Sequence, residues 1–173
     1  MLRHVVNTYS SAVTAVARRD RVMAKLIDRT EPFRLPRPDT PHFAALAESI
    51  LYQQLAGSAA AAIHRRFVAL FDGDLSPDAV LALHARKLRG AGLSRSKVAC
   101  IRDLAAKVVD GTVRLHRIGR LSDEKIIESL SVVRGNGQWT AEMFLIFQLR
   151  RLDVWPVGDY RVRTGYALPY GLP

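Results

Sequence analysis

Residues 130–160 read LSVVRGNGQWTAEMFLIFQLRRLDVWPVGDY, and two breaks interrupt their apolar helical pattern. The first break, Val133-Arg134-Gly135-Asn136-Gly137, predicts a tight helix-hairpin-helix. Glycine at both positions allows a positive φ and a close approach of the backbone to a partner. The N–H groups that open the next helix would then bind an anion such as a DNA phosphate. The alternative is an ordinary C-cap glycine followed by a turn.

The second break is Trp155-Pro156-Val157-Gly158-Asp159-Tyr160, where proline and glycine separate two helical patterns. Asp159 is a candidate N-cap residue, and on one interpretation it only accepts an N–H of the new helix. On the other, the positive helix end keeps Asp159 ionised at a cleft, where it stabilises a developing cation or polarises water. Asp153 is the rival carboxylate but lacks the Gly-Asp-Tyr context, and Glu48 and Glu142 lie inside helical patterns as weaker candidates.

The composition favours a polyanionic partner. The chain has 173 residues, 49% of them hydrophobic, and a formal charge of +10 from 26 Lys and Arg against 16 Asp and Glu. Such an excess attracts phosphates, so nucleic acid is the expected partner and an anionic membrane surface the competitor. No apolar run has the length of a membrane span, and the N-terminus lacks the core of a secretion signal. We expect a cytoplasmic, nucleoid-associated protein.

Apolar spacing predicts an all-α fold, because no convincing strand alternation occurs. Helices are expected over residues 9–27, 42–56, 78–88 and 94–109. A further alanine-rich helix is expected to end at residue 71, and another to begin after an N-cap at Ser122. The connection 29–41 contains four prolines, 110–120 is a loop, and 165–173 is loop-like. Two domains are predicted: 1–41, an N-terminal helix and its connection, and 42–173. The helix over 94–109 has a basic side available to face outward, formed by Arg95, Lys97, Arg102 and Lys107.

The hairpin, Trp139-Thr140-Ala141 and the Gly-Asp-Tyr sequence together resemble the helix-hairpin-helix Gly/Pro-Asp superfamily of base-excision DNA glycosylases. The most similar branch is 3-methyladenine-DNA glycosylase II, with Arg134 in place of the usual proline and Asn136 in place of the usual aliphatic residue. The resemblance extends from about Ala24 to the last residue. It implies compact helical lobes flanking a cleft, with no N-terminal β domain. In the family further helices follow, so it also implies a C-terminally incomplete chain.

The resemblance assigns roles to individual residues. Asp159 would be the catalytic carboxylate. Gln53-Gln54-Leu55 would enter the minor groove, with Leu55 filling the gap left by a flipped base; a leucine packed at a helix corner is the alternative. The expected base pocket consists of Trp139, Tyr160, Met143 and Tyr52. The expected hairpin contacts to DNA are Gly135, Asn136, Gly137 and Thr140.

The implied chemistry needs no organic cofactor. A monovalent cation would be held by the backbone carbonyls of Ser131, Val133 and Asn136. Cys100 is the single cysteine and an expected core residue, so this chain has no four-cysteine iron–sulfur cluster. Trp139 stands where the lyase branch has its Schiff-base lysine, which predicts a monofunctional enzyme.

We therefore expect a monomeric glycosylase that releases alkylated purines such as 3-methyladenine from damaged double-stranded DNA. The alternatives are a non-catalytic helix-hairpin-helix DNA-binding module and a glycosylase of the same fold for uracil or another lesion.

Overall fold

The protein is described by a computed structural model that covers residues 2–32, 34–55 and 57–172. No strand occurs among these residues, and the predicted all-α fold is confirmed. The chain forms two compact units. The central unit consists of Pro38–Leu149, and the terminal unit combines Met1–Arg37 with Arg150–Pro173. The boundary between domains after residue 41 stays a prediction.

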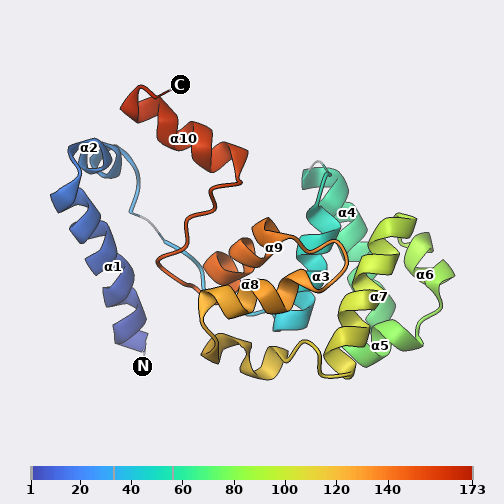
Figure 1. Cartoon of the computed structure of the whole chain (residues 1–173). Coiled ribbons are helices and arrows are strands. Elements are labelled where there is room, and N and C mark those ends of the chain that lie inside the picture. Colours follow the sequence, from blue (N-terminus) through green and yellow to red (C-terminus); the bar gives the residue numbers. More distant parts are fainter. Residues whose placement is uncertain (1, 33, 56, 173) are drawn as a thin grey trace. The chain divides into compact units, whose positions relative to one another are not determined.

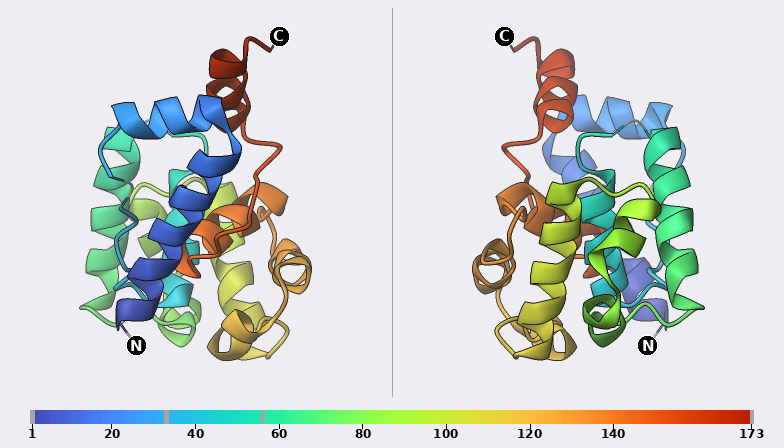
Figure 2. Two further views of the ribbon diagram at one scale, coloured as in Figure 1. Left: turned by 90° about the vertical axis from the view of Figure 1, so that its left-hand side faces the viewer. Right: turned by 90° about the vertical axis from the view of Figure 1, so that its right-hand side faces the viewer.

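The central unit contains most of the helices (Figure 1). Its α-helix α7 packs against α3, α5 and α6, and α8 packs against α9. Figure 2 shows α7, in yellow-green, beside α3 in cyan from two directions. The elements are α3 (His42–Tyr52), α4 (Gly57–Val68), η1 (Ala69–Phe71), α5 (Pro77–Ala82), α6 (Ala85–Gly90), α7 (Arg95–Val109), η2 (Leu115–Arg120), α8 (Asp123–Ser131), α9 (Gln138–Met143) and the π-helical turn η3 (Phe144–Gln148).

The core of the central unit follows the helical spacing of its apolar residues. Helices α3 and α7 each bury one stripe of side chains, as expected for amphipathic helices on a shared core. Cys100 is buried in this core as a free thiol, as predicted. The fully buried large side chains include Leu46, Ile50, Phe67, Ile101, Leu104, Ile126, Leu130 and Leu145.

The structure corrects three expectations for the central unit. The single helix predicted over 78–88 is two helices, because Leu83 is extended and the His84 ring accepts the N–H of Arg86 at 3.1 Å to begin α6. The predicted loop 110–120 contains η2. The N-cap role of Ser122 is confirmed, since its Oγ accepts the N–H of Lys125.

The third correction concerns the basic side of α7. Arg102 donates to the carbonyls of Val80 and Leu83, Lys107 pairs with Asp103 at 2.6 Å, and Lys97 donates to the end of α3. Helix C-termini leave carbonyls without helical partners, and cations satisfy them. Three of the four residues predicted to face outward are therefore engaged within the fold.

The terminal unit contains α1 (Leu2–Arg19), α2 (Arg21–Arg29) and α10 (Tyr160–Tyr170). The one helix predicted over 9–27 is broken at Asp20, whose carboxylate accepts the N–H groups of Val22 and Met23 and so begins α2. The Tyr170 hydroxyl also donates to Asp20, which ties α10 to the junction of α1 and α2.

The loop predicted over 165–173 is wrong, because α10 continues to Tyr170. Gly171 has φ +63 and donates to the carbonyl of Leu168, while Leu172 donates to that of Ala167. This is a Schellman ending. Pro169 lies in the last turn, where its missing N–H removes only one helical hydrogen bond.

Candidate active site

The hairpin between α8 and α9 is formed around one glycine with a positive φ. Gly135 has φ +77, and the N–H of Asn136 donates to the carbonyl of Val133 at 3.0 Å. Gly137, where glycine would also allow a positive φ, is instead extended, with φ of −97 and ψ of −179. A Cβ added to Gly137 would meet nothing within 4 Å. The backbone at Gly137 is therefore open on the side where a Cβ would stand.

Helix α7 fixes the start of this hairpin. The N–H of Arg134 donates to Asp103 Oδ2 at 2.7 Å, and Lys107 Nζ lies 2.6 Å from both oxygens of that carboxylate. Burial raises the pKa of Asp103, but the hydrogen bonds from Arg134 and Lys107 outweigh it, and the net pKa is lowered. A proline at position 134 could not make this contact, because proline has no backbone N–H.

Lys97 holds the Gln-Gln-Leu corner that follows α3. Its ammonium donates to the carbonyls of Ile50 at 3.2 Å, of Leu51, and of Gln53 at 2.9 Å. Burial lowers the pKa of Lys97, while the nearby Cys100 raises it to a smaller extent. The corner is thereby fixed by one cation at the end of α3.

The Gln53 side chain joins this corner to the hairpin. Its amide nitrogen donates to the carbonyl of Gly135 at 3.1 Å and to Thr140 Oγ1 at 3.2 Å. Beyond it, Gln54 has φ +58 and the Leu55 side chain is 37% exposed. The structure thus brings together three residues predicted to contact DNA and leaves Leu55 accessible; their contacts with DNA stay predictions.

A cavity of about 460 Å³ lies between α3, α9 and η3. Three of the predicted pocket residues line it: Tyr52, Trp139 and Met143. The predictions missed Phe144, Phe147, Gln148 and Glu48. The apolar run that contains the two phenylalanines was recognised only as a helix. The π-helical turn, in which Leu149 donates to the carbonyl of Phe144 at 3.0 Å, has no sequence signature that could have exposed it. We call this space the aromatic cavity.

The polar end of the aromatic cavity is ordered by Gln148. Its amide nitrogen donates to the carbonyl of Thr40 at 2.7 Å and to His42 Nδ1 at 3.0 Å. Accepting at Nδ1 requires the neutral ring, and burial lowers the pKa of His42 in the same direction. The His42 ring also packs edge-on against Phe144, with 5.5 Å between centroids. These contacts hold η3 against the start of α3.

Asp159 is the N-cap of α10, as predicted. Its Oδ1 accepts the N–H of Val162 at 2.9 Å, and its own N–H donates to the carbonyl of Pro156. Tyr160, the remaining predicted pocket residue, follows it in the terminal unit and is 78% exposed. The neighbouring aromatic contacts are Trp155 against Tyr166 at 5.3 Å and Tyr166 stacked on Tyr170 at 4.4 Å. The catalytic and base-binding roles stay predictions.

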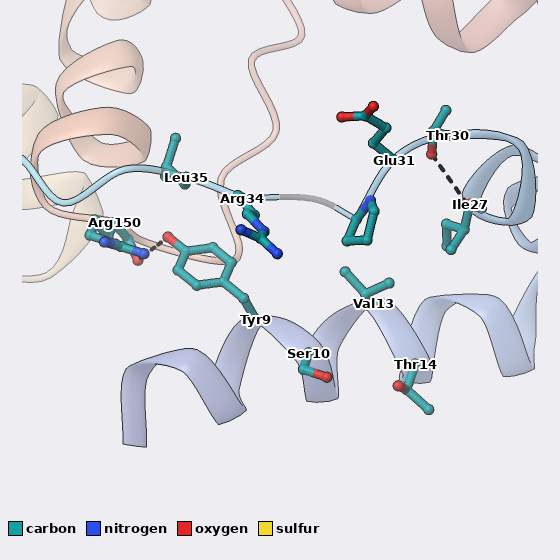
Figure 3. A pocket seen from close by; sticks show the side chains of 11 residues that line it. Tyr9, Ser10, Val13, Thr14, Ile27, Thr30, Glu31, Arg34, Leu35 and Arg150 are labelled. Atoms are coloured by element: carbon teal, nitrogen blue, oxygen red, sulfur yellow. Dashed lines mark hydrogen bonds between the residues drawn. The ribbon is translucent and has the colours of Figure 1, made fainter. Parts of the chain in front are cut away.

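A second cavity, of about 660 Å³, lies within the terminal unit between α1, α2 and residues 30–32 and 34–35 (Figure 3). Arg150 borders it with its guanidinium over the Tyr9 ring, 5.0 Å from the centroid. The Tyr9 hydroxyl donates to the carbonyl of Arg150 at 3.2 Å. These two contacts attach the segment that follows η3 to α1.

The described residues contain no group of three His, Cys, Asp or Glu that could hold a metal ion. A cation bound by the carbonyls of Ser131, Val133 and Asn136 would leave no such group and stays a prediction. In the same part of the chain, no helix is both long and apolar enough to span a lipid bilayer.

A helical unit with a glycine hairpin joined to an aromatic cavity defines a helix-hairpin-helix protein with space for a planar ligand. The chain belongs to the HhH-GPD superfamily of base excision DNA repair proteins, whose family model matches residues 47–172. The resemblance inferred from the sequence is thereby confirmed.

Individual relatives agree with this assignment. The chain is 32% identical to DNA-3-methyladenine glycosylase 1 of Schizosaccharomyces pombe, over 87% of this chain and 67% of that protein. It is 31% identical to the DNA-3-methyladenine glycosylase of Saccharomyces cerevisiae, over 78% of this chain and 48% of the relative. The solved structure of the S. pombe 3-methyladenine DNA glycosylase in complex with abasic DNA matches this chain with a TM-score of 0.84 and 29% sequence identity. The match covers 94% of this chain and 82% of the chain in that structure. The chain thus spans about two thirds and about half of the lengths of these two curated relatives.

Proposed function

We propose that the chain is a monofunctional DNA glycosylase that hydrolyses the N-glycosidic bond of alkylated purines, such as 3-methyladenine, flipped out of double-stranded DNA. The observation that carries the proposal is the hydrogen-bonded connection between the hairpin and the aromatic cavity through Gln53. The hairpin would hold the DNA backbone, and the aromatic cavity would hold the extruded base. The relatives named as 3-methyladenine glycosylases, one of them bound to abasic DNA, support it.

The cavity suits an alkylated base. Such a base carries a positive charge on a flat ring, and the faces of Tyr52, Trp139 and Phe147 attract cations. Because a cationic base is a good leaving group, no strong general acid is required. By the family resemblance Trp139 stands at the position of the lyase lysine, and its indole has no amine to form a Schiff base.

Asp159 would act on the sugar. Hydrolysis passes through an oxocarbenium-like species, and a fixed carboxylate stabilises that charge and orients the attacking water. The N-terminus of α10 and the N–H of Val162 favour the ionised form of this carboxylate.

DNA would be held without sequence preference. The open backbone at Gly137 would accept a DNA phosphate, and a cation held by the hairpin carbonyls would bridge the hairpin to that phosphate. Leu55 would fill the space left by the flipped base. The charge of +10 adds a salt-dependent attraction. We propose that the protein acts as a monomer on the DNA of the nucleoid.

The test is release of 3-methyladenine and 7-methylguanine from alkylated duplex DNA by the chain, by Asp159→Asn and by Asp153→Asn. Release that is lost in Asp159→Asn and retained in Asp153→Asn supports the proposal and the choice of carboxylate. Salt-sensitive DNA binding without release of these bases by the parent chain would contradict it and favour a DNA-binding module or another lesion.

A further inference from the structure

We propose that Glu48 makes the aromatic cavity selective for positively charged bases over neutral bases of the same shape. This inference rests on the proposed function, because it assigns a residue to base selection within that cavity. Glu48 has the only carboxylic acid side chain among the described residues that line the cavity.

Helical spacing places Glu48 beside the aromatic wall. Glu48 and Tyr52 are four residues apart on α3, so their side chains lie on the same face one turn apart. Trp139 and Met143 are likewise four residues apart on α9 and line the same cavity. The carboxylate therefore belongs to a cavity whose other walls are mostly aromatic or apolar.

The carboxylate of Glu48 keeps its capacity to accept hydrogen bonds from a ligand. Its nearest basic group is His64 of α4, with Nδ1 at 3.8 Å from Oε1, which exceeds a hydrogen-bond distance. The His64 ring also lies edge-on to Tyr52, with 6.1 Å between centroids. The Glu48 side chain is 41% exposed, so water screens its charge in part but not fully.

A charge in this position acts on binding more than on bond breaking. The base is cationic when bound and becomes neutral as it leaves, so a nearby carboxylate stabilises the bound state at least as much as the transition state. A neutral isostere gains a hydrogen bond at most. Glu48 should therefore favour the cationic base in affinity and in KM, with little effect on kcat.

Three duplexes test the inference by direct binding. One contains 7-methylguanine on a 2′-fluorinated sugar that resists cleavage, one contains neutral 7-methyl-7-deazaguanine of the same shape, and one contains a tetrahydrofuran abasic analogue. The parent chain should bind the cationic duplex about 3- to 10-fold more tightly than its neutral isostere. Glu48→Gln should remove most of that preference and leave binding of the abasic duplex unchanged.

Glu128→Gln is the matched control, since Glu128 is exposed on α8 and carries the same charge. It should keep the parent's preference. The inference would be overturned if the parent chain bound the two methylated duplexes with equal affinity. It would also be overturned if Glu48→Gln reduced the affinity for both of them by the same factor. If instead the parent binds neither methylated duplex better than undamaged DNA, the proposed base pocket fails as well; excision of 7-methylguanine with no effect of Glu48→Gln removes only the inference.

Discussion

Gly135 lies so close to Cys100 that a Cβ atom built on the glycine would stand 2.5 Å from the cysteine Sγ. Gly135 also has a φ of +77, a backbone angle that residues other than glycine rarely adopt. Gly135→Ala should therefore lower the free energy of unfolding by about 2–5 kcal/mol, from strained backbone and overpacking together. Urea-induced unfolding of the variant and the parent chain measures this difference.

Two controls separate the causes. Gly137→Ala should change stability by less than about 1 kcal/mol, because its backbone is extended and a Cβ there meets open space. In the background of Cys100→Ala, the cost of Gly135→Ala should fall, since the clash disappears while the positive φ remains. Equal costs in both backgrounds would show that Cys100 does not restrict this position.

The second prediction concerns Lys97. Replacing it by methionine keeps the length of the side chain but removes the donor to the carbonyls of Ile50, Leu51 and Gln53. Unpaired carbonyls in a partly buried site cost about 1–3 kcal/mol, so Lys97→Met should destabilise the fold by roughly 2–4 kcal/mol. Hydrogen exchange at Gln54 and Leu55 should also become faster, because the corner loses its anchor.

Lys87→Met is the control for a lost positive charge, since Lys87 is exposed on α6. It should leave stability and exchange at the corner unchanged. If the two variants behave alike, Lys97 contributes only its charge, and its contacts with α3 carry no structural weight.

Local patterns predicted the N-caps correctly, whereas the error on the basic side of α7 depends on contacts between distant segments. Ser122 and Asp159 are N-caps whose partners lie three residues away, so residue type and position sufficed. The outward face assigned to α7 failed because Lys97 meets carbonyls more than 40 residues earlier in the chain. Periodicity identifies a polar side but does not show which carbonyls lie opposite it.

In the candidate site, too, some residues were predicted from the sequence and others are seen only in the structure. Trp139 and Tyr52 were predicted for the base pocket through a resemblance, and the structure places both in one cavity. Phe147 lies four residues after Met143, so helical spacing places it on the same side, and Gln148 follows it at the end of the π-helical turn η3. The sequence pattern indicates Glu48 only as a weaker candidate for the catalytic carboxylate. Its position in the cavity depends on the packing of α3 beside η3.

The third prediction uses the lowered pKa of Asp103. Its carboxylate is bound by the N–H of Arg134 and by Lys107, so in the folded protein the pKa lies below the ordinary value of 3.8. A carboxyl with a lowered folded pKa stabilises the fold above 3.8, and this contribution is lost as the pH falls through its folded pKa. Asp103→Asn should cost about 1–3 kcal/mol near neutral pH and progressively less in acid.

Urea unfolding of Asp103→Asn and the parent chain at neutral pH and at about pH 3 gives the comparison. The difference between the two proteins should shrink at the lower pH. A difference that persists unchanged would show that the carboxylate's charge contributes nothing. Arg134→Pro should also destabilise the chain, because it removes the N–H that Asp103 accepts.

The last prediction concerns Asn136, which is only 5% exposed. Its amide oxygen and nitrogen are both buried and have no hydrogen-bond partner within the described part of the chain. A buried polar group without a partner costs about 1–3 kcal/mol. Asn136→Leu, which keeps the branching at Cγ, should raise the free energy of unfolding by about 1–2 kcal/mol. Asn136→Asp keeps the shape of the side chain and should lower the free energy of unfolding, because the new charge is buried.

Thermal and urea unfolding of the parent chain and the two variants would distinguish these outcomes. A loss of stability in Asn136→Leu would mean that the amide is satisfied in solution by water or a cation at the hairpin, and the same variant would then bind DNA less tightly.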